Sequence, residues 1–176
     1  ASTLFPISTN GNTITIRRFS RKPWTIPQFL DPKMHDMSKE IAALIWLVMQ
    51  YELNVIIAGG TASGKTSTLN VLCSLIQPTN RVISIEDTRE IALPQSLYWN
   101  WVPLTSRNPN PEGQGGISML DLIVASLRMR PDRIIVGEIR RKEQAQALFE
   151  AMHTGHSVYA TMHADTAQQV KRRLLE

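Results

Sequence analysis

The chain has 176 residues, of which 43% are apolar and 19% are charged, with 19 Lys and Arg against 15 Asp and Glu. This composition excludes a disordered or fibrous chain, and the single cysteine excludes an intrachain disulfide framework and an all-cysteine metal site. Six of the basic residues but only two of the acidic ones lie among the first 39, so the net charge of +4 belongs to the amino-terminal stretch. The basic residues of this stretch either contact an anion or lie on a solvent-exposed edge.

The amino-terminal stretch predicts a strand and then a linker. Thr13, Ile14, Thr15 and Ile16 alternate over residues 12–19 after an Asn-Gly turn, which favours a half-buried strand. Prolines at positions 23, 27 and 32 then interrupt any regular element. We therefore predict that residues 1–35 are the end of an amino-terminal domain with its linker, and that residues 36–176 form a second domain. The chain begins without methionine and ends within a helical pattern over residues 168–176, so we expect a piece of a longer protein.

The first helix of the second domain is predicted from residue 38 onward, with Asp36 or Ser38 as its N-cap. Its apolar residues recur at helical spacing and share one face, which we expect to be buried. These residues are Ile41, Leu44, Ile45, Val48 and Met49. The uninterrupted apolar run here covers nine residues, against the roughly twenty that a membrane-spanning helix needs.

Beyond this helix, short apolar runs alternate with amphipathic segments. We predict strands over residues 55–58, 81–85, 134–136 and 158–162 and helices over residues 65–76 and 142–153, with a further helix that begins at Ser118 and has Asp121 in a capping-box-like position. Apolar strands separated by helices indicate a mainly parallel sheet with helices on both faces, an α/β fold. Residues 93–116 fit no regular element, and loops of this length are usually functional or disordered. Tyr98, Trp99 and Trp101 are candidates to anchor this segment in the core.

A phosphate-binding loop follows the first apolar run. The loop lies between a predicted strand and a predicted helix, and its pattern is a glycine, any four residues and then Gly-Lys-Ser/Thr. The residues that match this pattern are Gly59-Gly60-Thr61-Ala62-Ser63-Gly64-Lys65-Thr66. Glycines let backbone N–H groups turn inward around phosphates, and the helix start adds unpaired amides and a positive dipole end. Lys65 is expected to reach the β- and γ-phosphates, and the Thr66 hydroxyl is expected to ligate Mg²⁺. The sequence therefore predicts a nucleotide site.

Acidic residues at two strand ends complete this prediction. Glu138 ends the strand over residues 134–136, and Glu86 with Asp87 ends the strand over residues 81–85. Because ligands of open parallel sheets bind beyond the carboxyl ends of the strands, we expect these acids to lie beside the phosphate loop. For either acid alone, a helix cap or a turn is an equally good interpretation.

Three of the four histidines, His153, His156 and His163, fall within eleven residues. Their spacing does not resemble a closed zinc site, and Cys73 is remote. His156 follows a predicted helix and His163 a predicted strand, which places both near one sheet edge. They are either polar residues of the nucleotide site or structural histidines.

Taken in order, these motifs resemble the type II/IV secretion-system ATPase family, the hexameric motors of secretion, pilus and archaeal flagellum assembly. The resemblance covers nearly all of residues 17–164, and the sequence around the phosphate loop is most similar to archaeal members. Residues 58–66 are similar to the family's Walker A loop, residues 84–90 to its aspartate box, residues 134–140 to its atypical Walker B with Gly-Glu, and residues 154–156 and 161–164 to its histidine box. The resemblance implies a P-loop NTPase of RecA-like type, preceded by the end of a smaller α+β amino-terminal domain.

The family also implies roles for individual residues. Glu86 would orient or activate the attacking water, Glu138 would hold Mg²⁺ through water, and His163 would sense the γ-phosphate. The nucleotide-binding set would be Gly59, Gly60, Thr61, Ala62, Ser63, Gly64, Lys65, Thr66 and Ser67, together with Arg17, Arg18 and Arg21 from the amino-terminal domain. Arg128, Arg130 and Arg140 flank the Walker B strand and would contact the nucleotide, a neighbouring subunit or surface carboxylates. The four-cysteine insert of many bacterial members is absent, so no zinc is expected.

The function that this resemblance implies is Mg²⁺-dependent hydrolysis of ATP by a homohexameric motor, in the cytoplasm at the membrane, that works with an inner-membrane platform protein. Two alternatives stay open: a RecA-like nucleic-acid motor and a nucleotide-binding regulator that does not hydrolyse. We expect no nucleic-acid partner, because residues 40–176 are neutral overall and aromatic residues make up 6% of the chain.

Overall fold

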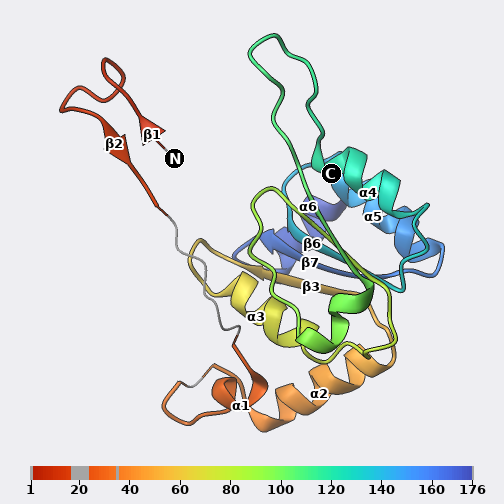
Figure 1. Cartoon of the computed structure of the whole chain (residues 1–176). Coiled ribbons are helices and arrows are strands. Elements are labelled where there is room, and N and C mark those ends of the chain that lie inside the picture. Colours follow the sequence, from red (N-terminus) through yellow and green to blue (C-terminus); the bar gives the residue numbers. More distant parts are fainter. Residues whose placement is uncertain (1, 17–23, 35, 176) are drawn as a thin grey trace.

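The computed structural model describes residues 2–16, 24–34 and 36–175. Its main body is a five-stranded sheet with helices on both faces (Figure 1). The strands are β3 (Val55–Gly59), β4 (Val82–Glu86), β5 (Trp101–Thr105), β6 (Arg133–Ile139) and β7 (Ser157–His163), and their order in the sheet is β3-β7-β6-β4-β5. All four neighbouring pairs are parallel, so the predicted mainly parallel α/β sheet is confirmed.

Alternating side chains of the strands divide the core into two clusters. Ile134 and Val136 of β6 pack with α4 (Met119–Ser126) and α5 (Lys142–His153) on one face, while Ile135 packs on the other face with α3 (Lys65–Cys73). Successive residues of a strand point to opposite faces, so a strand covered on both sides is apolar throughout. This explains why Val-Ile-Ser-Ile-Glu of β4 is buried at every position.

Cys73 ends α3 inside the second cluster and is fully buried. Burial among apolar side chains raises the pKa of its thiol well above the ordinary value.

The segment over residues 93–116 contains two elements that the sequence did not reveal, a 3₁₀ helix, η1 (Gln95–Asn100), and the strand β5. Strand β5 lies at the end of the strand order, where Pro103 can be accommodated because an edge strand does not need every N–H group for the ladder. Only part of the predicted aromatic anchor is correct. Leu97 is buried and Trp101 half-buried, but Tyr98 and Trp99 are 56% and 70% exposed.

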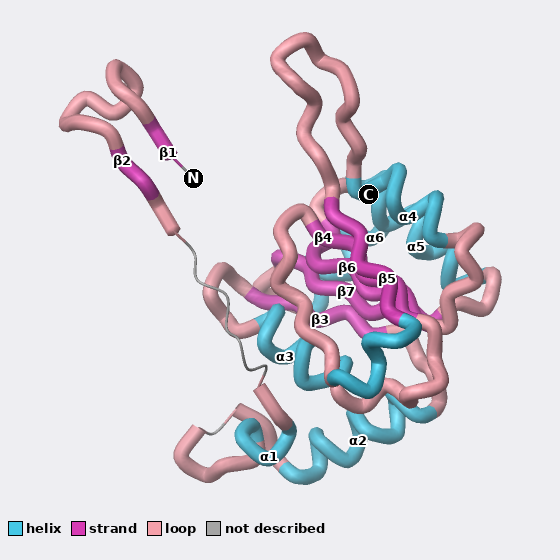
Figure 2. The backbone as a smooth tube through the Cα atoms, viewed as in Figure 1, coloured by secondary structure: helices cyan, strands magenta, loops and turns pink. Residues whose placement is uncertain are grey.

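After β5, residues 106–117 form a long hairpin-like loop that extends from the body (Figure 2). Its two ends are joined by backbone hydrogen bonds in both directions between Arg107 and Ile117, at 2.9 and 2.8 Å.

Helix α2 (Lys39–Gln50) begins where predicted, with Ser38 as the N-cap accepting from the Ile41 N–H at 3.3 Å. Its predicted buried face is only partly buried. Met49 is 1% exposed against α3, whereas Ile41 and Leu44 are 51% and 61% exposed. The carboxyl-terminal end of α2 therefore packs on the domain, and its first two turns present apolar side chains to solvent.

The amino-terminal stretch contains a short antiparallel pair, β1 (Ser2–Thr3) with β2 (Thr13–Ile14), and a short helix, α1 (Ile26–Phe29). Of the predicted strand over residues 12–19, the structure describes residues 12–16, where only Thr13–Ile14 is a strand, and Ile14 is 75% exposed rather than half-buried. Arg17, Arg18 and Arg21 lie outside the described residues, and the domain boundary near residue 35 stays a prediction.

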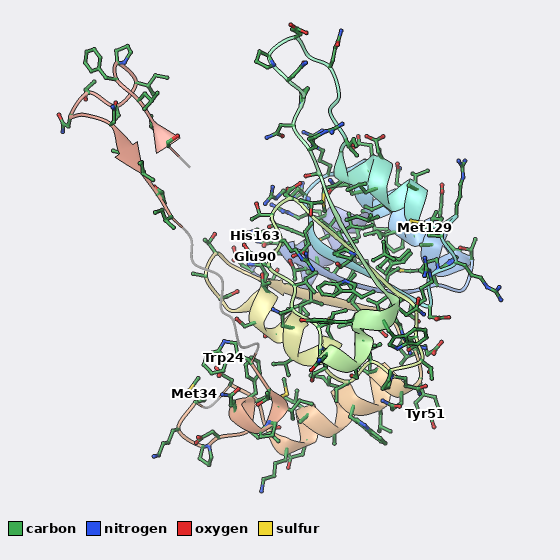
Figure 3. The ribbon with its side chains drawn as sticks, viewed as in Figure 1. Trp24, Met34, Tyr51, Glu90, Met129 and His163 are labelled. Carbon is green, nitrogen blue, oxygen red and sulfur yellow. The ribbon has the colours of Figure 1, made fainter. Side chains whose placement is uncertain are left out.

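The end of the sheet opposite the phosphate loop contains a buried cation. Arg133, at the start of β6, is 0% exposed, and its guanidinium donates to Asn80 Oδ1 at 3.0 Å, Ser157 Oγ at 3.0 Å and Glu52 Oε1 at 2.9 Å. It also lies 5.8 Å from the centre of the Tyr159 ring. Figure 3 shows Tyr51, the C-cap that follows α2, at this end of the sheet and His163 at the other.

The last helix is α6 (Ala167–Leu175), close to the predicted residues 168–176. Among the described residues, no helix combines the length and hydropathy that crossing a membrane requires.

Candidate nucleotide site

The phosphate loop connects β3 to α3, as the sequence predicts. Gly64 is the N-cap of α3 with φ of +83°, a left-handed conformation that glycine adopts without strain. A Cβ atom on Gly59 would lie 2.5 Å from Ser63 Oγ, so a larger residue there would force the Ser63 side chain to turn away. Ser63 Oγ and Lys65 Nζ both donate to the Gly60 carbonyl, which closes the loop on itself.

A cavity of about 460 Å³ opens above this loop. Its wall combines the phosphate loop with the carboxyl ends of β4, β6 and β7, as expected for a parallel sheet. The residues that line it are Thr61, Ala62, Ser63, Gly64, Lys65, Thr66, Ser67, Glu86, Asp87, Thr88, Glu90, Met119, Gly137, Glu138, Arg140, Thr161 and His163. Gly59 and Gly60 do not line the cavity but hold the loop that does.

Glu86 is a fixed, buried carboxylate at the end of β4. It is 3% exposed, and its Oε1 accepts the backbone N–H groups of Glu90 at 2.7 Å and Ile91 at 2.8 Å. Burial raises the pKa of Glu86 above its ordinary value, and the two N–H groups oppose that shift. A carboxylate with a raised pKa beside a phosphate loop suits a general base.

Gly137 lets β6 approach this carboxylate. A Cβ atom at position 137 would lie 3.2 Å from Glu86 Cγ, tighter than ordinary van der Waals contact. The carbonyl of Gly137 accepts the Thr161 hydroxyl of β7 at 2.5 Å, which ties β6 to β7 at the floor of the cavity.

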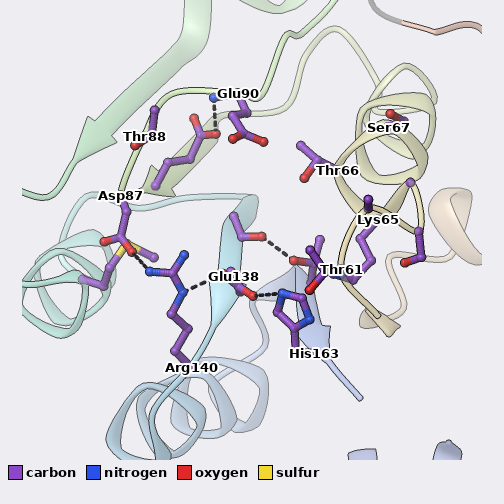
Figure 4. A pocket seen from close by; sticks show the side chains of 17 residues that line it. Thr61, Lys65, Thr66, Ser67, Asp87, Thr88, Glu90, Glu138, Arg140 and His163 are labelled. Carbon is purple, nitrogen blue, oxygen red and sulfur yellow. Dashed lines mark hydrogen bonds and ion pairs between the residues drawn. The ribbon is translucent and has the colours of Figure 1, made fainter. Parts of the chain in front are cut away.

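Glu138 is the centre of a chain of charged contacts (Figure 4). Its Oε1 lies 2.9 Å from His163 Nε2, and its Oε2 accepts from Arg140 Nε at 2.6 Å. The hydrogen bond to Glu138 raises the pKa of Arg140 above its ordinary value. His163 therefore lies in the cavity wall beside Glu138, and its part in nucleotide binding stays a prediction.

The chain continues to Asp87, an acid that the sequence placed at a strand end, and to Ser106, to which the sequence assigned no role. Arg140 also donates to Asp87 Oδ2 through Nη1 at 2.6 Å, and Asp87 Oδ1 accepts the Ser106 hydroxyl at 2.8 Å. The one sequence signal was that Asp87 follows Glu86 at a strand end; the partner Ser106 lies nineteen residues away.

The other two clustered histidines lie elsewhere. His156 Nδ1 is 3.0 Å from Thr154 Oγ1 and 3.2 Å from the Ala151 carbonyl, so it finishes the carboxyl end of α5, and His153 is exposed on the same helix. Arg128 and Arg130 are exposed after α4 and, unlike Arg140, are not part of the cavity wall. In the part of the chain that the structure describes, no three His, Cys, Asp or Glu side chains gather as a metal cluster.

The donor set nevertheless fits Mg²⁺. This ion keeps several waters and is usually held by one or two oxygen ligands together with substrate phosphates, so no dedicated cluster is needed. The Thr66 hydroxyl and the Glu138 carboxylate line the same cavity and supply such oxygens.

Comparison with known proteins identifies the family. The family model described as "Type II/IV secretion system protein" matches residues 1–176. An uncharacterized protein of Methanocaldococcus jannaschii is 40% identical over 168 residues, which are 96% of this chain and 29% of that protein.

Two solved structures share the fold. The VirB11 ATPase of the Brucella suis type IV secretion system, in complex with sulphate, matches 95% of this chain and 53% of its own at 26% identity and a TM-score of 0.66. The pilus retraction motor PilT with bound ADP matches 90% of this chain and 42% of its own at 25% identity and a TM-score of 0.68. The chain therefore belongs to the type II/IV secretion family and has its RecA-like ATPase fold, and it spans about half or less of these proteins.

Proposed function

We propose that this member of the type II/IV secretion family is the nucleotide-binding part of an Mg²⁺-dependent ATPase. The observation that carries the proposal is the convergence of the phosphate loop, Glu86 and Glu138 on one cavity. The names of the structural neighbours, an ATPase and an ADP-bound motor, agree with this chemistry.

The residues have distinct tasks in the proposed reaction. Phosphoryl transfer depends mainly on positioning and on neutralising charge, and the loop amides with Lys65 supply both for the β- and γ-phosphates. Glu86, buried and held by two N–H groups, accepts the proton of the attacking water. Bound Mg²⁺ would neutralise charge between the β- and γ-phosphates. Thr66 and Glu138 would hold it, Glu138 through water, and His163 beside Glu138 would sense the γ-phosphate.

In the whole protein we propose a homohexameric motor for secretion, pilus assembly or flagellum assembly, located in the cytoplasm against the membrane and working with an inner-membrane platform protein. Residues 1–35 would be the end of a smaller amino-terminal domain. Arg17, Arg18 and Arg21, which belong to the basic amino-terminal stretch, would bind the triphosphate.

The test is ATP turnover and ATP binding by the full-length protein. Lys65→Ala should abolish turnover and weaken ATP binding at least about tenfold, because the lost cation contacts two phosphates. Glu138→Gln should bind ATP within about threefold of wild type yet lose nearly all turnover. Lys142→Ala is the matched control, since Lys142 is an exposed lysine outside the cavity wall and should behave as wild type.

The same assay separates the alternatives. Stimulation by single-stranded DNA that disappears steeply with salt would instead indicate a nucleic-acid motor. Tight ATP binding with no turnover in intact hexamers would indicate a regulator. Normal turnover by Glu138→Gln would contradict the assignment of Glu138.

A further inference from the structure

A second cavity lies beside the nucleotide cavity, and the two share a wall. This second cavity, of about 920 Å³, extends between the base of the 106–117 loop and the amino-terminal ends of α4 and α5. Asp87, Thr88, Met119 and Arg140 line both cavities. The Arg140–Asp87 ion pair is therefore part of the partition between the phosphate site and the loop.

Arg140 holds two carboxylates from different strands at once. Its Nε donates to Glu138 two residues before it, and its Nη1 donates to Asp87, which follows β4, both at 2.6 Å. The planar guanidinium presents its donors in a fixed fork, so the two carboxylates are held in one geometry. A lysine ammonium, a point charge on a flexible stem, would not reproduce that geometry.

The Arg140–Asp87 ion pair contributes little to the stability of the fold. The Arg140 side chain is 60% exposed and that of Asp87 is 40% exposed. Ion pairs between exposed side chains contribute about 0–1 kcal/mol to stability, so the pair adds little to the fold. What the pair does is join Glu138 and Asp87 through one guanidinium.

Asp87 in turn holds the first residue of the loop. The Ser106 hydroxyl donates to Asp87 Oδ1 at 2.8 Å, and the Ser106 N–H donates to the Glu86 carbonyl at 3.0 Å. The loop beyond Ser106 has its own hydrogen bonds, including that of Arg107 Nε to the Gly115 carbonyl at 2.7 Å. A shift of Asp87 would therefore be transmitted to the base of an internally bonded hairpin.

We propose that Arg140 is a positioning residue that fixes Glu138 at the phosphate loop and couples it, through Asp87 and Ser106, to the 106–117 loop. The proposal rests on the proposed function, since Glu138 must respond to Mg²⁺ and ATP. The Arg140 guanidinium would have to share the Glu138 carboxylate with any Mg²⁺ held there, so Arg140 would shift from Glu138 toward its other partner, Asp87. Coupling between two sites is reciprocal and typically about 5- to 150-fold, so what holds the loop also changes nucleotide affinity.

Hydrogen–deuterium exchange of the full-length protein tests this coupling without reference to turnover. The amides of Arg107, Gly113, Gln114 and Ile117 are hydrogen-bonded within the loop and report its state. With Mg²⁺ and a non-hydrolysable ATP analogue, we expect their exchange rates in wild type to change by about fivefold or more. In Arg140→Ala that change should fall below twofold, while Lys142→Ala should respond as wild type.

Ser106→Ala and Arg140→Lys separate the positioning of Glu138 from the coupling to the 106–117 loop. Ser106→Ala removes the hydrogen bond to Asp87 but leaves both contacts of Arg140, so the loop response should be lost while saturated turnover stays within about twofold. Arg140→Ala should lower saturated turnover by about 10- to 100-fold at a nearly unchanged KM, since a misplacement near 1 Å costs that much. Arg140→Lys should recover the charge without recovering the loop response.

The outcomes distinguish this inference from the proposed function. If wild type does not bind the analogue, the proposed function fails first. If wild type binds it and the loop of Arg140→Ala responds as strongly as that of wild type, ATP binding stands and the coupling role of Arg140 is refuted. A loop response that persists in Ser106→Ala would also refute the route through Asp87.

Discussion

Replacing Glu86 by glutamine and by alanine should separate its chemical task from its structural one. In wild type, one carboxylate oxygen accepts the N–H groups of Glu90 and Ile91, and the other is available to the cavity. Glutamine keeps an oxygen for both N–H groups but cannot accept a proton from water. Alanine removes the acceptor altogether.

The structure gives different magnitudes for the two changes. For Glu86→Gln, loss of a general base should lower kcat by about 10²- to 10⁴-fold, or about 3–5 kcal/mol of activation free energy. The free energy of unfolding should change by less than about 1 kcal/mol, because the N–H groups of Glu90 and Ile91 both keep an acceptor. For Glu86→Ala, two N–H groups lose their acceptor, and the free energy of unfolding should fall by about 2–4 kcal/mol.

Steady-state ATP turnover and urea unfolding of the full-length protein measure these two quantities separately. ATP affinity should stay within about threefold of wild type for Glu86→Gln, since neither loop amides nor Lys65 is touched. Turnover by Glu86→Gln within threefold of wild type would refute the role as base. Equal unfolding free energies for Glu86→Gln and Glu86→Ala would refute the structural reasoning.

Three further predictions concern the surroundings of the site. Gly137→Ala places a methyl group 3.2 Å from Glu86 Cγ, so it should lower kcat about 3- to 30-fold in the same turnover assay, with ATP binding retained. Arg133→Met removes a fully buried guanidinium from Asn80, Ser157 and the half-exposed Glu52, and calorimetry should show an unfolding temperature lower by about 2–12 °C, which corresponds to about 1–3 kcal/mol. Burial raises the pKa of Glu86, so turnover should fall as pH drops through that raised value. Because the folded-state pKa lies above the unfolded one, the stability linked to this proton is present at low pH and lost as pH rises through the folded value. Glu86→Gln should remove that pH dependence of unfolding, and an unchanged pH profile in the variant would contradict the assignment.

The sheet and the phosphate loop were predictable because their signals are local. Val55, Ile83, Ile134 and Val158 belong to apolar runs that are too short for helices and are separated by amphipathic segments. Strand β5 was not predictable in the same way, because Pro103 interrupts its apolar pattern and argues against an interior strand. Its place at the sheet edge, where the missing N–H group is tolerated, is a property of the strand order.

The sequence predicted only those site residues that directly follow or end an apolar strand. Glu86 and Glu138 each end a strand, and the parallel sheet brings them to one edge. The contacts of Arg140 with Asp87, and of Asp87 with Ser106, join residues 53 and 19 positions apart and depend on β4 lying between β6 and β5. Nor does helical spacing reveal that Ile41 and Leu44 would face solvent, since periodicity identifies an apolar face but not what covers it.

The burial of Cys73 has a practical consequence for following the loop in solution. A thiol reacts as its thiolate, and this one is both enclosed by α3 and its neighbours and held protonated by its apolar surroundings. A cysteine introduced at exposed Glu112, near the tip of the 106–117 loop, would therefore react with a maleimide dye while Cys73 does not. Cys73 does not have to be replaced, so the core keeps its wild-type sequence. A single fluorophore can then record loop movement in real time as nucleotide is added.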